Sequence, residues 1–194
     1  IEVTFDVDVM KNQDFRWNIG ANATWLKNKV LALPEENRKN GIVTGNFKWM
    51  EGHGRYDYWL WQFAGVDQMT GQSLYLADTE RFNVNGSAPG KDPIPAADLI
   101  EINGKYYVTN PSSYGKRDWS GSVIPKMNGS FNTLFTYKNF SLSGLFTYAI
   151  GGKTFDESYR TLMSMSGTPS SLHADLLNSW NGTPEGMTLK SENR

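Results

Sequence analysis

The sequence predicts an all-β fold made of antiparallel strands. Two pairs of long segments alternate between apolar and polar residues, interrupted in the second pair by Leu134 and Leu145, and a short polar turn joins the members of each pair. In addition, the chain has no run of about 18 apolar residues that would form a membrane-spanning helix. Because strand side chains point alternately to the two faces of a sheet, each pair should form a hairpin with one apolar and one polar face.

The N-terminal hairpin is predicted from residues 1–10 and 15–25, which are joined by a polar turn at about residues 11–14. Pairing Val9 with Phe15 places the apolar residues of both strands on one face. The same register puts Asp8 opposite Arg16, a favourable charge pair on the polar face. Ile1 already lies within the alternating run, so we expect a processed or partial chain that begins in mid-strand.

The middle of the chain has weaker strand patterns. Residues 55–64 form an aromatic-rich strand whose faces are hard to assign, and residues 72–77 form another strand after a short turn. A small local hairpin is predicted at residues 100–108, around a turn at Asn103 and Gly104. We expect long loops at residues 26–54, 78–128 and 151–194, with a helical segment at residues 171–180 in the last of them.

The second long hairpin spans residues 130–137 and 140–150, with a turn at Lys138 and Asn139. Pairing Tyr137 with Phe140 across this turn brings both apolar sets to one face, whereas a register shift of one residue would separate them. The predicted apolar face contains Phe131, Phe135 and Tyr137 from the first strand and Phe140, Leu142, Phe146, Tyr148 and Ile150 from the second.

The six predicted strands are connected alternately by short turns and by long loops. Short turns at one end and long loops at the other are typical of outer-membrane β-barrels. Six strands are fewer than the roughly eight that a single-chain membrane barrel needs, and open strand edges are not tolerated in lipid. We therefore expect either that the rest of a barrel lies outside these 194 residues or that the protein is not a membrane protein.

Composition and motifs give no indication of catalysis. The net charge of −1 gives no electrostatic basis for binding nucleic acid, and the absence of cysteine excludes disulfides and thiolate sites. His53 and His173 lie far apart, and we expect His173 to be a packing or hydrogen-bonding residue. Asp67 is most simply a turn residue, with a calcium site as the alternative. We expect no enzyme activity, no cofactor and no bound metal.

Several short motifs occur in order along the chain. They are residues 25–30 after a Phe-x-Trp strand, 64–67 followed by Thr70-Gly71 and Leu74-Tyr75, 124–126, 137–143, 150–153 and 172–180. Together they resemble the C-terminal part of the SusC/RagA family of TonB-dependent outer-membrane transporters. The sequence departs from the family at Gln68, where proline is usual, and over residues 78–114, which match no family motif.

The resemblance implies that residues 1–194 are a partial TonB-dependent receptor β-barrel domain, part of a 22-stranded antiparallel transmembrane barrel with long extracellular loops. It also implies location in the outer membrane of a Gram-negative bacterium of Bacteroidetes type. The implied function is import of oligosaccharides, or of peptides, driven by TonB. The implied partners are a SusD-like surface lipoprotein lid, TonB through parts absent from this sequence, the remaining barrel and plug, the substrate and membrane lipid.

Aromatic residues in the predicted loops are the candidate substrate-binding residues. The aromatic group near residues 49–61 can be an interfacial girdle or a platform on which sugar rings stack. Tyr114, Trp119 and Trp180 can contact substrate or the lid, or they can anchor the loops. The complete set of candidates is Trp49, Tyr56, Tyr114, Trp119 and Trp180.

A soluble all-β glycan-binding module is the alternative function. In that case the apolar faces would pack against a second sheet, as in a β-sandwich. In a transporter they would instead point into lipid, as we expect for Phe5, Trp17, Phe131, Phe140 and Phe146. The two hypotheses therefore differ in what covers the apolar face.

Overall fold

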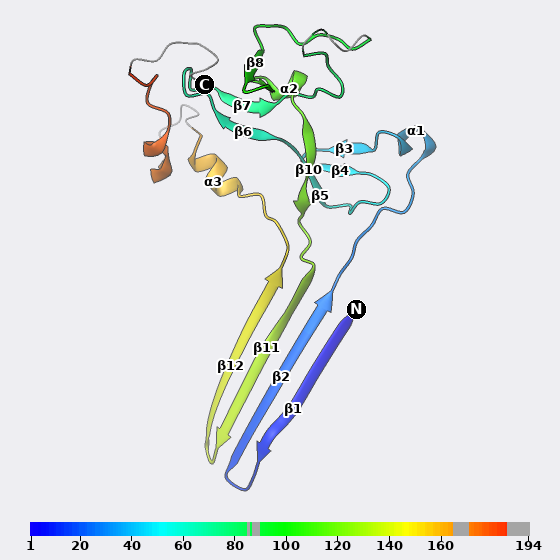
Figure 1. Ribbon diagram of the computed structural model, residues 1–194. Coiled ribbons are helices and arrows are strands. Elements are labelled where there is room, and N and C mark those ends of the chain that lie inside the picture. Colours follow the sequence, from blue (N-terminus) through cyan, green and yellow to red (C-terminus); the bar gives the residue numbers. More distant parts are fainter. Residues whose placement is uncertain (85, 87–89, 165–170, 186–194) are drawn as a thin grey trace. The chain divides into compact units, whose positions relative to one another are not determined.

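The computed structural model describes residues 1–84, 86, 90–164 and 171–185 (Figure 1). The chain divides into two compact units, which are described separately. The first comprises residues 1–58 and 120–154, and the second comprises residues 59–119 and 155–194. Strands dominate both units, which confirms the predicted all-β class. No helix within the described ranges is long and apolar enough to cross a membrane.

The first unit contains a sheet of four long strands, which we call the long-strand sheet. Its strands are β1 (Glu2–Lys11), β2 (Phe15–Trp25), β11 (Met127–Tyr137) and β12 (Phe140–Ile150), in the spatial order β1-β2-β11-β12. All neighbouring strands are antiparallel. A short turn joins each sequential pair, whereas residues 26–126 lie between β2 and β11. The sheet is open in this chain, since β1 and β12 are its edges.

The predicted register of the second hairpin is confirmed. Tyr137 pairs with Phe140, and the pairing continues without a shift to Met127 and Ile150. Lys138 takes a positive φ of 53° in the turn. The predicted apolar sets of β11 and β12 therefore lie on one face, whereas Leu134 and Leu145 lie on the other.

The predicted register of the first hairpin is wrong by two residues. Asp8 lies opposite Asn18 rather than Arg16, and the register changes between Asp8 and Met10 at a bulge. The predicted charge pair is nevertheless confirmed, because Arg16 Nε–H donates to the Asp8 carboxylate at 2.9 Å. The side chain of Asn12 accepts hydrogen bonds from the backbone N–H groups of Asp14 and Phe15, which forms the turn. A shift of two residues keeps the side chains of residues 2–8 on their predicted faces, whereas the bulge places Met10 opposite Trp17.

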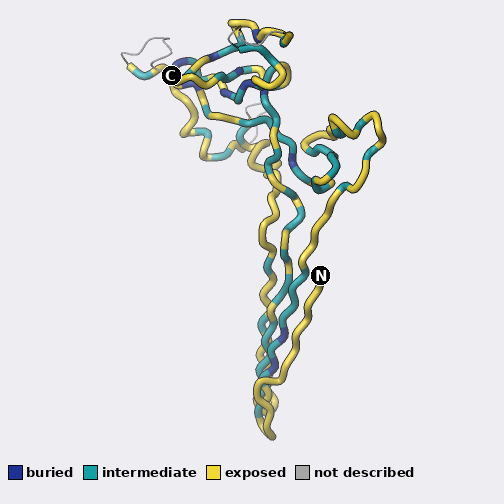
Figure 2. Tube along the Cα trace, turned by 45° about the vertical axis from the view of Figure 1, so that its right-hand side comes forward, coloured by how far each residue is buried: buried dark blue, intermediate teal, exposed yellow. Residues whose placement is uncertain are grey.

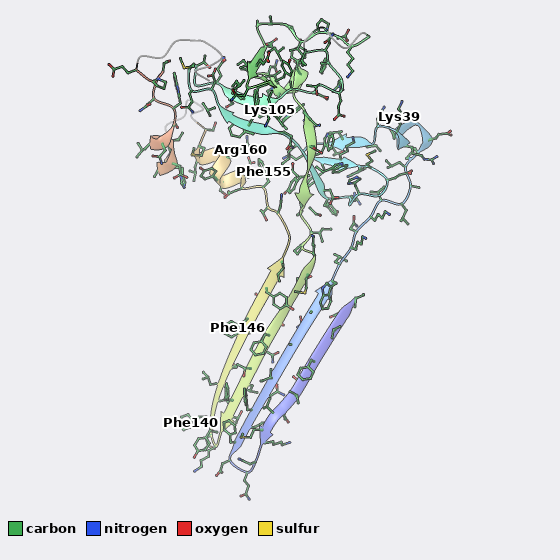
Figure 3. The ribbon with its side chains drawn as sticks, in the orientation of Figure 1. Lys39, Lys105, Phe140, Phe146, Phe155 and Arg160 are labelled. Atoms are coloured by element: carbon green, nitrogen blue, oxygen red, sulfur yellow. The ribbon has the colours of Figure 1, made fainter. Side chains whose placement is uncertain are left out.

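The two faces of the long-strand sheet differ in character. On the apolar face, Leu142 is 71% exposed, Phe146 64% and Phe5 56%, so no layer of the described chain covers it. Figure 3 shows Phe140 and Phe146 on β12, and Figure 2 shows β1 exposed along its length. The opposite face is mostly polar, although Leu134 and Leu145 also lie on it. Asn18 donates hydrogen bonds there to Asp6 (3.0 Å) and Asp8 (3.1 Å).

Two further four-stranded sheets form from residues outside the long-strand sheet. One has the order β10-β5-β4-β3 and the other the order β6-β7-β9-β8. Their strands are β3 (Ile42–Thr44), β4 (Phe47–Trp49), β5 (Asp57–Trp61), β6 (Phe63–Val66), β7 (Ser73–Leu76), β8 (Leu99–Ile102), β9 (Lys105–Val108) and β10 (Arg117–Ser122). The helices are α1 (Glu35–Arg38), α2 (Pro111–Tyr114) and α3 (Glu157–Leu162), with a 3₁₀ helix η1 (Ala174–Asn178).

Residues 55–64 and 72–77 contain strands, as predicted, but these strands do not join the long-strand sheet. The first of these segments divides at Gln62 into β5 and β6, which belong to different sheets, and β7 pairs with β6 and β9. The backbone carbonyl of Gln62 accepts a hydrogen bond from the Leu76 N–H, and the Gln62 N–H donates one to the Lys116 carbonyl. The long-strand sheet therefore has four strands with one long connection, and residues 57–66 contribute no strand to it.

The predicted loops also contain regular structure. The hairpin at residues 100–108 is confirmed as β8 and β9, with Asn103 and Gly104 at positive φ of 51° and 73°. The predicted helical segment at 171–180 is confirmed as the 3₁₀ helix η1. In the second unit, Val108 is fully buried and forms a core with Ala77 and Ile94, around which partly buried aromatic residues pack.

Candidate functional site

The apolar face of the long-strand sheet is stabilised by contacts within the sheet. The Trp17 ring stacks on Phe135 at 5.2 Å, and its Nε1–H donates to Thr133 Oγ1 at 3.0 Å. Tyr148 extends across Gly129 and donates its hydroxyl hydrogen bond to the Asn22 carbonyl at 3.0 Å. Both polar groups of these aromatic side chains are therefore satisfied without a second layer.

Trp49 and Tyr56 lie together in the first unit. The Arg55 guanidinium carbon is 5.1 Å from the Trp49 ring centroid and 5.6 Å from that of Tyr56, within the range of a cation–π contact. Phe47 contacts Tyr56 edge-on at 6.2 Å. These two candidate residues are therefore brought together, but a cation of the chain itself is associated with both rings.

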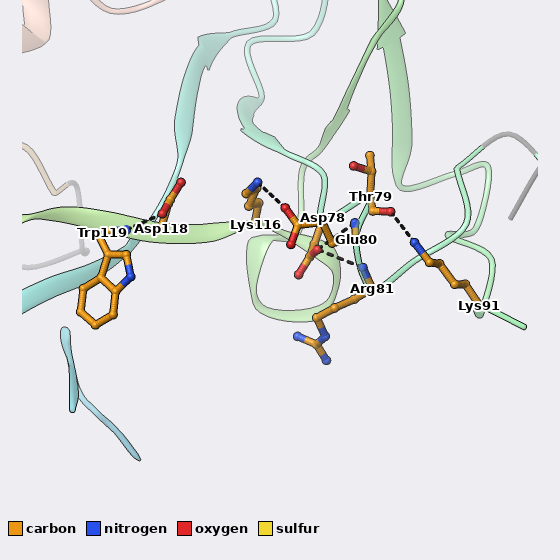
Figure 4. Close-up of polar contacts among 8 residues, drawn as sticks. All are labelled: Asp78, Thr79, Glu80, Arg81, Lys91, Lys116, Asp118 and Trp119. Atoms are coloured by element: carbon orange, nitrogen blue, oxygen red, sulfur yellow. Dashed lines mark hydrogen bonds and ion pairs between the residues drawn. The ribbon is translucent and has the colours of Figure 1, made fainter. Parts of the chain in front are cut away.

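Tyr114 and Trp119 have structural partners in the second unit. Tyr114 packs edge-on against Phe82 at 5.3 Å and contacts the Val108 core, so it anchors its loop. Trp119 contacts Trp59 at 5.0 Å. Figure 4 shows the polar groups nearby, including the Trp119 backbone N–H donating to the Asp118 carboxylate.

Lys116 forms a solvent-exposed ion pair in the same region. Its ammonium group is 2.9 Å from a carboxylate oxygen of Glu80 (Figure 4). The hydrogen bond to Glu80 and its negative charge raise the pKa of Lys116 above 10.5. Asp78 accepts hydrogen bonds from the backbone N–H groups of Glu80 and Arg81, which shapes the turn that carries this carboxylate.

Trp180 lies over the turn at residues 67–71. Its Nε1–H donates to the Gln68 carbonyl at 2.8 Å, and Thr183 donates to the Met69 carbonyl at 2.7 Å. A Cβ at Gly71 would lie 2.7 Å from Cδ2 of the Trp180 ring, so glycine permits this close packing. Two motifs that are more than 100 residues apart in the sequence are thus joined.

Trp180 also lines a cleft of about 980 Å³ in the second unit, which we call the Trp180 cleft. One side comes from β6 and the turn that follows it, and the other from the end of η1 and the segment after it. Its lining residues are Phe63, Gly65, Val66, Gln68, Leu177, Asn178, Ser179, Trp180, Asn181, Gly182, Thr183 and Pro184. Sequence reasoning identified Trp180 but missed Phe63, Gln68 and Asn181, because no motif spacing indicated that the two segments meet.

The N-terminal end of η1 is held to α3 by side-chain contacts. The Tyr159 hydroxyl donates to Asp175 at 3.0 Å, which raises the pKa of Tyr159 above 10.0. His173 accepts a hydrogen bond from the Asp175 backbone through Nδ1, and its ring packs 4.9 Å from that of Tyr159. This confirms His173 as a packing and hydrogen-bonding residue.

Asp67 is a structural turn residue. It is 1% exposed, and its carboxylate accepts hydrogen bonds from the Met69 backbone (3.0 Å) and the Thr70 hydroxyl (2.8 Å). In the described part of the chain, no group of three or more His, Cys, Asp or Glu side chains is arranged to hold a metal ion.

Two curated proteins of Formosa agariphila are similar in sequence to this chain. TonB-dependent receptor P3 is 24% identical over 180 residues, which is 89% of this chain and 16% of the receptor. TonB-dependent receptor P39 is 24% identical over 178 residues, or 79% of this chain and 17% of the receptor. The predicted resemblance to TonB-dependent receptors is confirmed. The chain spans about one sixth of the length of these relatives, and no family model matches it.

Solved structures of a transporter share the fold. A chain in the structure of the RagAB peptide transporter superposes with a TM-score of 0.68 at 17% identity, covering 98% of this chain and 20% of that chain. A chain of the RagAB peptide importer in the closed-closed state gives 0.55 at 20% identity, covering 77% of this chain and 14% of that chain. The relatives are named as receptors and the solved proteins as a transporter or importer, and none is named as an enzyme.

Proposed function

We propose that these residues form part of a TonB-dependent nutrient transporter of the SusC type in a Gram-negative outer membrane. One observation carries the proposal: the long-strand sheet has an uncovered apolar face and a polar opposite face. Its strands of 10 or 11 residues match the length that a tilted β-strand needs to cross a bilayer, about 9–11 residues. The sandwich alternative requires a covering sheet, and Leu142 and Phe146 remain mostly exposed in the described chain.

In this function the long-strand sheet is one sector of the 22-stranded barrel wall. The short turns at residues 12–14 and 138–139 lie at the periplasmic end, and residues 26–126 form an extracellular loop. The remaining barrel strands pair with the open edges of β1 and β12. A SusD-like lipoprotein covers the extracellular side, TonB drives transport through the plug, and the cargo is an oligosaccharide or a peptide.

Epitope insertion into the full-length gene product tests this topology. A tag at Gly45 in the β3–β4 turn should be detected on intact cells, because a Cβ there meets nothing within 4 Å and the site is open. A tag at Gln13 should be detected only after the outer membrane is permeabilised. The protein should be recovered from the outer-membrane fraction. Recovery in a soluble fraction, with both tags hidden until lysis, would refute the proposal.

A further inference from the structure

We propose that the Trp180 cleft binds a neutral oligosaccharide. This inference rests on the proposed function and gives the cargo a chemical class and a site. The cleft volume of about 980 Å³ lies within the range of ligand sites, roughly 300–1,000 Å³. Its walls come from two segments that are fixed to each other by the hydrogen bonds from Trp180 to Gln68 and from Thr183 to Met69.

Two aromatic rings in the cleft are suitable for stacking. Trp180 is 41% exposed although its N–H is bonded and part of its ring covers Gly71, so its orientation is set before any ligand arrives. Phe63 is 59% exposed and is supported edge-on by Tyr75 at 5.7 Å. The negative face of an aromatic ring attracts the C–H groups on the flat side of a sugar ring.

The polar groups of the cleft match hydroxyl groups. Asn178 and Asn181 line it, and each amide side chain offers both donors and acceptors of hydrogen bonds. A sugar hydroxyl also donates and accepts, so it can pair with either end of an amide. The combination of exposed rings with amides is therefore complementary to a carbohydrate surface.

The uncharged lining of the cleft favours a neutral carbohydrate over a peptide or an acidic glycan. The described lining residues include no Asp, Glu, Lys or Arg, although these make up 20% of the whole chain. The charged termini of a short peptide, or the carboxylates of an acidic glycan, would lose hydration there without an opposite charge to pair with. A neutral chain of sugars has no such cost.

Calorimetric titration of the full-length protein in detergent tests the inference. The probes are maltohexaose, cellohexaose, laminarihexaose and xylohexaose as neutral hexamers, a galacturonic acid hexamer as an acidic one, and a mixed hexapeptide pool. At least one neutral hexamer should bind more tightly than the acidic and peptide probes. Phe63→Ser and Trp180→Ala should each weaken that binding about tenfold or more. Trp25→Ala, which removes a 45%-exposed tryptophan outside the cleft, should leave it unchanged.

Phe63→Ser keeps the Trp180 hydrogen bond, so it tests the site even if Trp180→Ala disturbs the segment after η1. Binding of no neutral hexamer, stronger binding of the peptide pool or the acidic hexamer, or equal affinity in all variants would overturn the inference. The membrane fraction from which each protein is recovered is recorded for the same preparations. A protein that is located in the outer membrane but fails these titrations would remove this inference and leave the proposed function in place.

Discussion

Arginine substitutions along one strand test the lipid-facing surface. β12 has 11 residues, which at about 3.4 Å each span roughly 35 Å along the strand. A tilt of about 45° reduces this to roughly 25 Å along the membrane normal, the height of the apolar band of such barrels. Phe146 lies next to the middle of β12, Leu142 is nearer to the turn, and Ile150 lies at the other end.

The expected cost of arginine depends on depth and on face. Phe146→Arg should lower the free energy of unfolding by about 2–4 kcal/mol, Leu142→Arg by less, and Ile150→Arg by about 0–1 kcal/mol. Thr147→Arg and Ser143→Arg on the polar face serve as matched controls and should cost little. In water, arginine at a site as exposed as Phe146 would change stability by only about 0.5 kcal/mol.

The assay is urea unfolding of the full-length protein in lipid vesicles, followed by the mobility shift of folded and unfolded protein on gels. A profile that peaks near Phe146 and is absent from the polar face supports the lipid-facing assignment. A flat profile, or equal costs on both faces, would refute it.

Three further predictions concern packing and ionisation. Gly129→Ala should destabilise the long-strand sheet by about 1–3 kcal/mol, because its Cβ would lie 2.6 Å from Tyr148 Oη and would also collide with the Asn22 carbonyl. Gly144→Ala is the control and should be tolerated, since its Cβ meets Phe146 at 3.5 Å. Equal unfolding midpoints for the two variants would contradict this prediction. Gly71→Ala should speed hydrogen exchange around Trp180 more than Gly45→Ala does around its own turn, since both glycines have positive φ but only Gly71 lies against a ring. The hydrogen bond from Arg160 lowers the pKa of Glu157 below 4.5. The stabilisation of α3 by this pair is therefore present above pH 4.5 and is lost as the pH falls through the lowered pKa. NMR titration should show the Glu157 midpoint rising toward 4.5 in Arg160→Ala, and an unchanged midpoint would disprove the pairing.

The hairpin patterns show what sequence can predict here. The turn at Lys138 and Asn139 leaves one register that brings both apolar sets to one face, and the structure has that register. The first hairpin is different, because alternation with period two fixes the face but allows a shift of two residues. The turn built on Asn12 and the bulge before Met10 decide the shift, and neither follows from the apolar pattern.

The loop region shows where sequence reasoning fails. An aromatic-rich run such as residues 57–66 has no polar face to mark its boundaries, so its division at Gln62 into strands of two sheets was not predictable. Trp180 was identified as a candidate from its residue type alone. Its partners Gln68 and Gly71 are distant in sequence, and only the tertiary structure brings them together.

Fluorescence quenching at single cysteines tests the central claim most directly. These 194 residues contain no cysteine, so Leu142→Cys, Ser143→Cys, Phe146→Cys and Thr147→Cys can each be labelled in turn within this region. Brominated lipid should quench the labels at 142 and 146 and spare those at 143 and 147, with the reverse order for a water-soluble quencher. Quenching by the aqueous reagent at all four positions, or by neither reagent at 142 and 146, would show that lipid does not cover the apolar face.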